Sequence, residues 1–276
     1  MPQHSLQHFI ETHRRLFVLT GAGCSTGSGI PDYRDRDGQW KRAPPITYQA
    51  FMQAESMRQR YWARSLAGWP RFSQAQPNAT HRALAQLERR GQLAMLVTQN
   101  VDRLHQRAGN RQVIDLHGRL DRVRCMDCTW RCQRAAFQCL LLERNPGCSL
   151  PDAAAAPDGD ADLDGFDFAG FRVPPCPRCG GVVKPDVVFF GEGVPRERVE
   201  AATDGWQAAD AVLVVGSSLM VYSGYRFVHA AAQAGKPVAA VCLGHTRADP
   251  LLTLKVDAPC DQALAFLHSA DAWATQ

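Results

Sequence analysis

The sequence lacks any apolar run that approaches the length of a membrane-spanning helix, and it lacks a strong excess of charge of one sign. Its first residues, MPQHSLQHFIETHRR, do not contain the apolar core of a secretory signal. The net charge of +4, from 31 basic and 27 acidic residues, is too small to indicate nucleic-acid binding. We therefore expect a cytoplasmic protein, or a mitochondrial matrix protein in a eukaryote, with neither membrane nor nucleic acid as a partner.

The chain is long enough for one large domain, or for one domain that carries a smaller insert. It has 276 residues, of which 45% are hydrophobic and 8% aromatic, a composition typical of a globular protein with a real core.

Cysteine, in contrast, is abundant, with ten residues in the chain. Four of them form two C-x-x-C pairs, Cys125 with Cys128 and Cys176 with Cys179, separated by residues 129–175. In a reducing compartment such paired motifs favour one structural zinc ion over disulfide bonds. Four thiolate ligands leave no open coordination position, so this zinc would stabilise the fold and take no part in chemistry.

Short apolar runs alternate with helical patterns along the rest of the chain. We expect buried strands at residues 16–19, 93–98, 113–116, 211–215 and 237–243, and helices at 48–65, 78–90, 196–209, 224–234 and 261–269. Such alternation predicts an α/β fold with a Rossmann-like parallel sheet, into which a smaller zinc-binding lobe is inserted. The predicted domains are residues 1–118 with 187–276 for the sheet and 119–186 for the zinc lobe.

The first strand leads into the stretch GAGCSTGSGIPDYR at residues 21–34. Glycines after a strand let backbone approach a pyrophosphate closely, and Arg34 could pair with a phosphate. The spacing is G-x-G-x-x-x-G and departs from the dinucleotide fingerprint G-x-G-x-x-G. The stretch alone therefore leaves a purely structural glycine turn as an alternative.

Residues 151–170, between the two cysteine pairs, contain six aspartates at 152, 158, 160, 162, 164 and 167. The glycine and the closing glutamate of a calcium-binding loop are absent at the required offsets. We interpret the segment as a solvated or disordered insertion of unknown role.

Several motifs, taken in order, resemble those of the sirtuins, a family of NAD-dependent protein lysine deacylases. They are GAGCSTGSGIPDYR, TQNVDRLHQRAG at 98–109, DLHG at 115–118, the two cysteine pairs, KPDVVFFGE at 184–192 and VGSSLMVYSG at 215–224. The resemblance covers nearly the whole chain, and the stretches YWAR and SGYRF are most similar to the class II branch of the family.

The resemblance implies the site residues. His117 would be the general base and Asn100 would act with it. The implied NAD contacts are Gly21, Ala22, Gly23, Ser25, Ile30, Asp32, Tyr33, Arg34, Gln99, Asn100, Asp102, Gly216, Ser217, Ser218, Cys242, Gly244 and Cys260. The implied substrate contacts are Tyr61, Arg64, Val188, Phe189, Phe190, Gly191, Glu192, Val221 and Tyr222, where an acyl-lysine protein segment would bind as an added strand.

The implied reaction transfers the acyl group of a lysine to ADP-ribose and releases nicotinamide. A histidine suits proton removal from a ribose hydroxyl at neutral pH. Mono-ADP-ribosyl transfer at the same NAD site is the alternative activity, whereas a scaffold or NAD sensor would need a broken active site.

Two features bear on specificity. Tyr61 and Arg64, three residues apart on a helix, resemble the pair with which class III sirtuins bind acidic acyl groups. On this resemblance we expect longer or acidic acyl groups to be preferred over acetyl; the alternative is a surface arginine beside a packing tyrosine. Cys242 stands where many sirtuins have asparagine, which removes an amide from the adenosine end of the NAD site.

Overall fold

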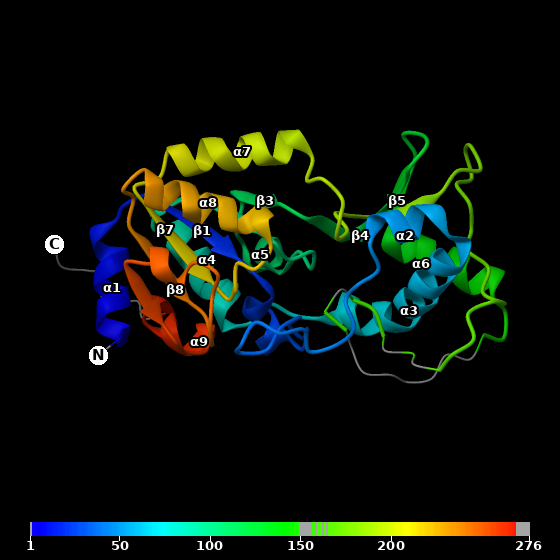
Figure 1. Cartoon of the computed structure of the whole chain (residues 1–276), viewed down its shortest axis with the longest axis horizontal. Coiled ribbons are helices and arrows are strands. Elements are labelled where there is room, and N and C mark those ends of the chain that lie inside the picture. Colours follow the sequence, from blue (N-terminus) through cyan, green and yellow to red (C-terminus); the bar gives the residue numbers. More distant parts are fainter. Residues whose placement is uncertain (1, 149–155, 158, 162, 164, 269–276) are drawn as a thin grey trace. The chain divides into compact units, whose positions relative to one another are not determined.

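The computed structural model describes residues 2–148, 156–157, 159–161, 163 and 165–268 (Figure 1). The chain divides into two compact units. Unit 1 comprises residues 1–42, 76–116 and 194–276, and unit 2 comprises residues 43–75 and 117–193. The domain boundaries expected from the sequence, 1–118 with 187–276 and 119–186, stay a prediction.

Unit 1 is built on a six-stranded sheet in which every neighbouring pair of strands is parallel. The central strands are almost entirely apolar and fully buried, as expected for a sheet covered on both faces. Their spatial order is β3 (Val113–Asp115), β2 (Leu93–Thr98), β1 (Leu16–Thr20), β7 (Ala211–Val215), β8 (Val238–Val241) and β9 (Leu254–Val256).

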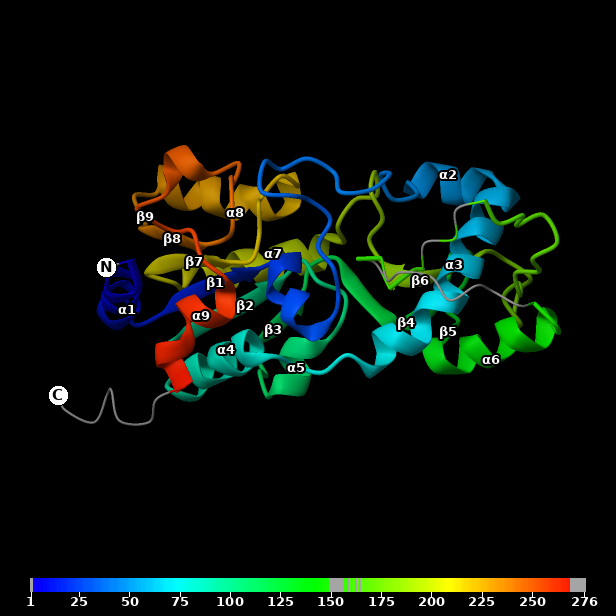
Figure 2. The ribbon, with the colours of Figure 1, turned by 90° about the horizontal axis from the view of Figure 1, so that it is seen from below.

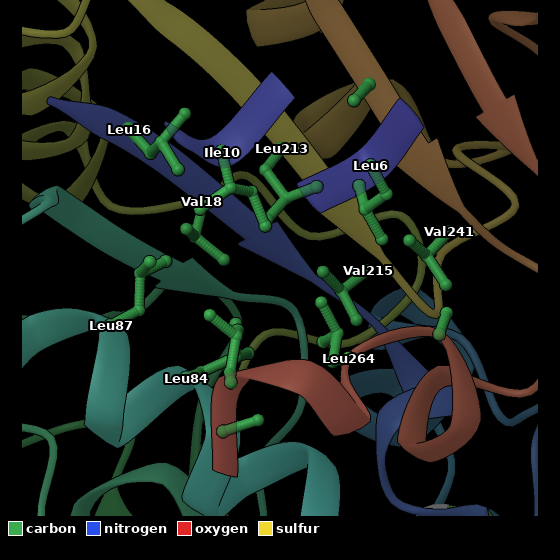
Figure 3. Packing of buried hydrophobic residues seen from close by; sticks show 14 of the residues in the cluster. Leu6, Ile10, Leu16, Val18, Leu84, Leu87, Leu213, Val215, Val241 and Leu264 are labelled. Atoms are coloured by element: carbon green, nitrogen blue, oxygen red, sulfur yellow. The ribbon is translucent and has the colours of Figure 1, made fainter. Parts of the chain in front are cut away.

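Helices cover both faces of this sheet. One face packs against α1 (Pro2–Thr12), α4 (Ala79–Arg89) and α9 (Cys260–Ala263), where Leu6, Ile10 and Leu84 meet Val18 and Leu213 (Figure 3). The other face packs against α7 (Arg196–Gln207) and α8 (Tyr222–Gln233), and Figure 2 shows α8 and α4 on opposite sides of the strands. The short helix α5 (Leu104–Ala108) follows β2.

Unit 2 holds a three-stranded antiparallel sheet in the order β5 (Arg131–Gln133), β4 (Gly118–Cys125) and β6 (Val183–Val187). Its helices are α2 (Tyr48–Gln53), α3 (Glu55–Gln74) and α6 (Arg134–Arg144), and α3 and α6 lie side by side in Figures 1 and 2. A parallel α/β sheet accompanied by a separate small lobe confirms the fold class expected from the sequence.

The helix α3 continues through Pro70, which has no N–H to donate to the carbonyl of Leu66. The Gln138 side chain on α6 donates to that carbonyl at 2.9 Å. One turn earlier on α6, the fully buried Arg134 donates to the carbonyl and the hydroxyl of Ser65, both at 3.1 Å. Side chains of α6 therefore supply donors where the proline removes one.

Most predicted elements are confirmed within a few residues, but the helix expected at 48–65 is two helices with a break at Ala54. The extended backbone of Ala54 ends α2, and α3 begins at Glu55. The helix expected at 261–269 is α9 followed by a one-turn 3₁₀ helix, Ala265–His268. Within the described residues, no helix is long and apolar enough to cross a membrane.

The prediction of a solvated insertion is wrong for the part of residues 151–170 that pairs with α3. Ala156, Asp160, Ala161 and Leu163 are at most 4% exposed. Close approach is possible because Gly68 on α3 has no side chain, since a Cβ there would lie 2.3 Å from the carbonyl of Gly159. The aspartates at 152, 158, 162 and 164 lie outside the described residues.

Candidate functional site

The glycine stretch joins the carboxyl ends of two neighbouring strands of unit 1. The N–H of Gly21 donates to the carbonyl of Val215 at 3.1 Å, and the N–H of Gly23 donates to the carbonyl of Gly216 at 2.8 Å. A Cβ on Gly21 would lie 2.8 Å from the Cβ of Ser217, so this glycine permits the approach of two backbones. The chain continues from Gly21 in two 3₁₀ turns, Ala22–Cys24 and Thr26–Ser28.

Ser25 is the centre of a polar network in this unit. Its hydroxyl donates to the carboxylate of Asp102 at 2.6 Å and accepts from the side-chain amide of Asn100 at 3.0 Å. The same amide donates to the carbonyl of Gly21, also at 3.0 Å. The fold thus brings together residues from the first glycine turn and from the end of β2, as the sequence motifs indicated.

Burial raises the pKa of Asp102, whereas hydrogen bonds from the Ser25 hydroxyl and the Leu104 N–H lower it. Burial outweighs these two donors, so the pKa of Asp102 is raised overall. Both amide hydrogens of Asn100 are used within the protein, so its Oδ1 is the atom that it offers to a ligand.

His81 and His105 belong to the same network, and sequence reasoning missed His81. It forms a capping box with Asn78 at the start of α4, with Nδ1 accepting from the Asn78 N–H, and its Nε2 lies 3.5 Å from the Ser25 hydroxyl. The two histidine rings are 4.8 Å apart. Burial lowers the pKa of His81 to about 4 and lowers that of His105 well below its usual value. The spacing Asn-x-x-His at a helix start was the available signal.

The residues after the glycines form a loop closed on itself. Arg34 donates to the carbonyl of Gly38 at 2.7 Å and lies over the Trp40 ring at 3.9 Å, while Asp32 pairs with Lys41. The carbonyl of Arg36 accepts from the N–H of His245 at 2.8 Å. The predicted phosphate-binding arginine is thus held in place by its own loop.

Further predicted cofactor residues of unit 1 lie after β2, β7 and β8 and at the start of α9. Gln99 donates to the hydroxyl of Ser217 at 2.7 Å. The N–H of Gly244 donates to Asp257 at 3.2 Å. Cys242 and Cys260 are both buried, and burial raises the pKa of Cys242 to about 12, so it is a neutral thiol.

His117 and the predicted substrate segment belong to unit 2. The carbonyl of His117 accepts from the N–H of Val188 at 2.8 Å. The carbonyl of Phe190 accepts from Tyr48 at 2.9 Å, and that of Gly191 accepts from the Gln49 side chain at 2.9 Å. The backbone at residues 188–191 is therefore fixed from several directions.

Tyr61 and Arg64 lie on α3 in different surroundings. Tyr61 is buried among aromatic rings, with centroids 5.4 Å from Phe51 and 5.2 Å from Phe189. Arg64 donates to the carbonyl of Ala161 at 3.0 Å, and Asp160 lies 4.0 Å from it. Arg64 thus holds the insertion, and its predicted role in acyl binding stays a prediction.

The four predicted zinc ligands of unit 2 converge. The sulfur atoms of Cys125, Cys128, Cys176 and Cys179 all lie within 4.8 Å of one another. Cys125 and Cys179 are 3.5 Å apart, and Cys128 and Cys176 are 3.7 Å apart. A tetrahedral zinc with bonds of about 2.3 Å requires sulfurs separated by about 3.8 Å, so these cysteines are positioned to bind one zinc ion.

Comparison with known proteins agrees with this arrangement. A protein of Xanthomonas axonopodis pv. citri named "NAD-dependent protein deacetylase" is 70% identical over 266 residues, which cover 96% of this chain and 91% of that protein. One of the same name from Bordetella bronchiseptica is 66% identical over 265 residues, covering 96% and 97% of the two chains.

Solved structures share the fold. A structure described as "Sir2-p53 peptide-NAD+" has a TM-score of 0.76 and 28% identity and covers 97% of both chains. Another, described as "Structural Basis for the Mechanism and Regulation of Sir2 Enzymes", has a TM-score of 0.75 and 31% identity over 96% of both chains. The model of the family described as "Sir2 family" matches residues 21–223. With more than half of its length matched, this chain belongs to the Sir2 family.

Proposed function

We propose that this chain is an NAD-dependent protein lysine deacylase that transfers the acyl group to ADP-ribose and releases nicotinamide. The observation that carries the proposal is the identity of 66–70%, over nearly the whole chain, to proteins named NAD-dependent protein deacetylase. The presence of His117, Asn100 and Asp102 supports an active enzyme and argues against a scaffold.

In this proposal the polar network of unit 1 holds NAD. NAD, when bound, supplies an electrophilic ribose carbon and a leaving nicotinamide. Asn100 accepts a hydrogen bond from a ligand hydroxyl through Oδ1, because both of its amide hydrogens are bound to Gly21 and Ser25. Asp102, held by Ser25, and the loop residues Ile30 and Asp32 line the nicotinamide side.

His117 acts as the general base in the proposal and removes a proton from a ribose hydroxyl. Its backbone is fixed by the bond from Val188. The four thiolates hold a zinc ion that has no open position for chemistry, so its contribution is to the stability of unit 2.

The substrate is a protein. One solved relative is described with a p53 peptide. We propose that the acyl-lysine segment binds as an added strand along residues 188–191, with Val221 and Tyr222 as further contacts. The preference for acidic or longer acyl groups through Tyr61 and Arg64 is part of the proposal, and an Arg64→Ala variant that keeps the wild-type ratio of acidic-acyl to acetyl turnover would remove it.

The test is NAD-dependent nicotinamide release on a panel of acyl-lysine peptides, with wild type, His117→Ala and the exposed His229→Ala as a matched control. Release by wild type and by His229→Ala but not by His117→Ala is expected. Mass spectrometry of the peptide distinguishes a lost acyl group from a gained ADP-ribose, which is the alternative activity. No release by zinc-loaded, folded protein would refute the proposal.

A further inference from the structure

Lys184, in β6, is a buried lysine inside the motif KPDVVFFGE. Its side chain is 1% exposed. The ammonium group donates to the carbonyl of Pro185 at 3.3 Å, to the carbonyl of Val187, and to the carboxylate of Glu192 at 3.0 Å. All three hydrogens of the ammonium group therefore have acceptors within this one motif.

Glu192 completes the arrangement from the other end of the motif. The same carboxylate oxygen that accepts from Lys184 accepts from the N–H of Phe189 at 2.9 Å. The N–H of Glu192 donates back to the carbonyl of Phe189 at 3.0 Å. The ammonium group lies 4.5 Å from the centre of the Phe189 ring. Lys184 and Glu192 together close the turn at residues 189–192.

A buried ion pair is a poor way to gain stability, because removing two charges from water offsets most of their attraction. An apolar pair of similar volume would fill the space but could not bind the carbonyl of Val187 and the N–H of Phe189 at once. The ion pair therefore specifies the path of the backbone between these residues. That path includes Val188, whose N–H donates to His117.

We propose that Lys184 is a positioning residue for the substrate: with Glu192 it sets the backbone of residues 188–191 in the form that an acyl-lysine strand can pair with. This inference rests on the proposed deacylase function. Removal of Lys184 weakens peptide binding and leaves NAD binding intact, because every predicted NAD contact lies in unit 1.

The experiment measures KM for an acetyl-lysine peptide, KM for NAD, and peptide affinity by fluorescence anisotropy. We expect Lys184→Met to raise the peptide KM and dissociation constant about tenfold, the effect of one or two lost hydrogen bonds, with the KM for NAD within about twofold of wild type. Lys184→Arg keeps the charge and the donors and is expected to restore peptide binding to within about threefold.

Lys236 provides a matched control in unit 1. Its ammonium group also donates to three carbonyls, those of Trp206, Gln207 and Ala209, and lies 4.5 Å from the centre of the Trp206 ring. Lys236→Met is expected to lower stability without changing the peptide KM.

If Lys184→Met lowers only the melting temperature and leaves the peptide constants as in wild type, the inference is overturned. If Lys184→Met does not fold, Glu192→Gln tests the inference instead, because glutamine keeps the shape of the side chain and removes its charge. An unchanged peptide affinity in Glu192→Gln would again overturn the inference. An inactive wild type would refute the proposed function instead.

Discussion

Replacement of Gly216 by alanine tests whether the glycine turn depends on backbone contact between two strand ends. Gly216 has φ of +64°, and a Cβ on it would lie 2.3 Å from the backbone N of Cys24 and 2.7 Å from the carbonyl carbon of Gly23. Both neighbours are backbone atoms, so no flexible side chain can move aside. The Gly21–Cys24 turn must shift if the variant folds.

Gly235 is the matched control, because it has nearly the same backbone conformation and a different environment. Its φ is +67°, and nothing lies within 4 Å of a Cβ placed there. Gly235→Ala therefore has only the cost of a left-handed conformation, about 1–2 kcal/mol. Gly216→Ala has that cost and an overpacking cost of about 1–3 kcal/mol, roughly 2–5 kcal/mol in total.

Urea unfolding gives the free energy of unfolding of both variants, and titration calorimetry gives their affinity for NAD. We expect Gly216→Ala to lose more stability than Gly235→Ala and to bind NAD at least about tenfold more weakly, because the displaced turn carries Ser25. Equal stability losses in the two variants, or unchanged NAD affinity in Gly216→Ala, would refute the reasoning.

Three further predictions concern zinc, pH and helix packing. Cys128→Ser leaves three thiolates, so metal analysis of the purified protein should show less than one zinc per chain and unit 2 should unfold at a lower temperature. His81 has a pKa of about 4 in the folded protein and about 6.5 in the unfolded chain. Between these pH values the unfolded chain binds more protons than the folded protein, so the free energy of unfolding falls as the pH drops, by roughly 2 kcal/mol at pH 5. His81→Gln should show a smaller loss between pH 7.5 and 5 than wild type, and a full loss in that variant would contradict this account. Gln138→Ala should cost about 1–3 kcal/mol by leaving the Leu66 carbonyl without its donor, but less in a Pro70→Ala background, where alanine supplies an N–H.

The sheet of unit 1 could be predicted because its central strands are apolar runs bounded by glycine or polar residues. Residues 211–215 were expected as a strand and are β7 with the same bounds. The helix α1 was not expected, although Leu6, Phe9 and Ile10 have helical spacing and are buried. The break at Ala54 had no glycine or proline to indicate it. Arg58 of α3 donates to the carbonyls of Phe51 and Met52 at the end of α2, both at 2.9 Å, and this long side-chain contact carries no signal in the local sequence.

In the candidate site, too, some contacts could be predicted from the sequence and others could not. The cysteine pairs predict their own convergence because two C-x-x-C motifs have one common use in a reducing compartment. The partners of Arg64 could not be predicted, because Asp160 and Ala161 are far from it in the sequence and their approach depends on the absence of a side chain at Gly68. A helical pattern shows which residues share a face, and it does not show what covers that face.

The Ser25 network shows how such distant contacts determine chemistry that a motif only suggests. The hydroxyl has one hydrogen, and Asp102 takes it. The oxygen is therefore an acceptor toward Asn100, whose amide nitrogen lies 3.0 Å away. Asn100 gives its other amide hydrogen to the carbonyl of Gly21, so its Oδ1 is the atom left for a ligand. The direction of these hydrogen bonds thus follows from the groups that meet at Ser25, which come from two separate motifs of the sequence.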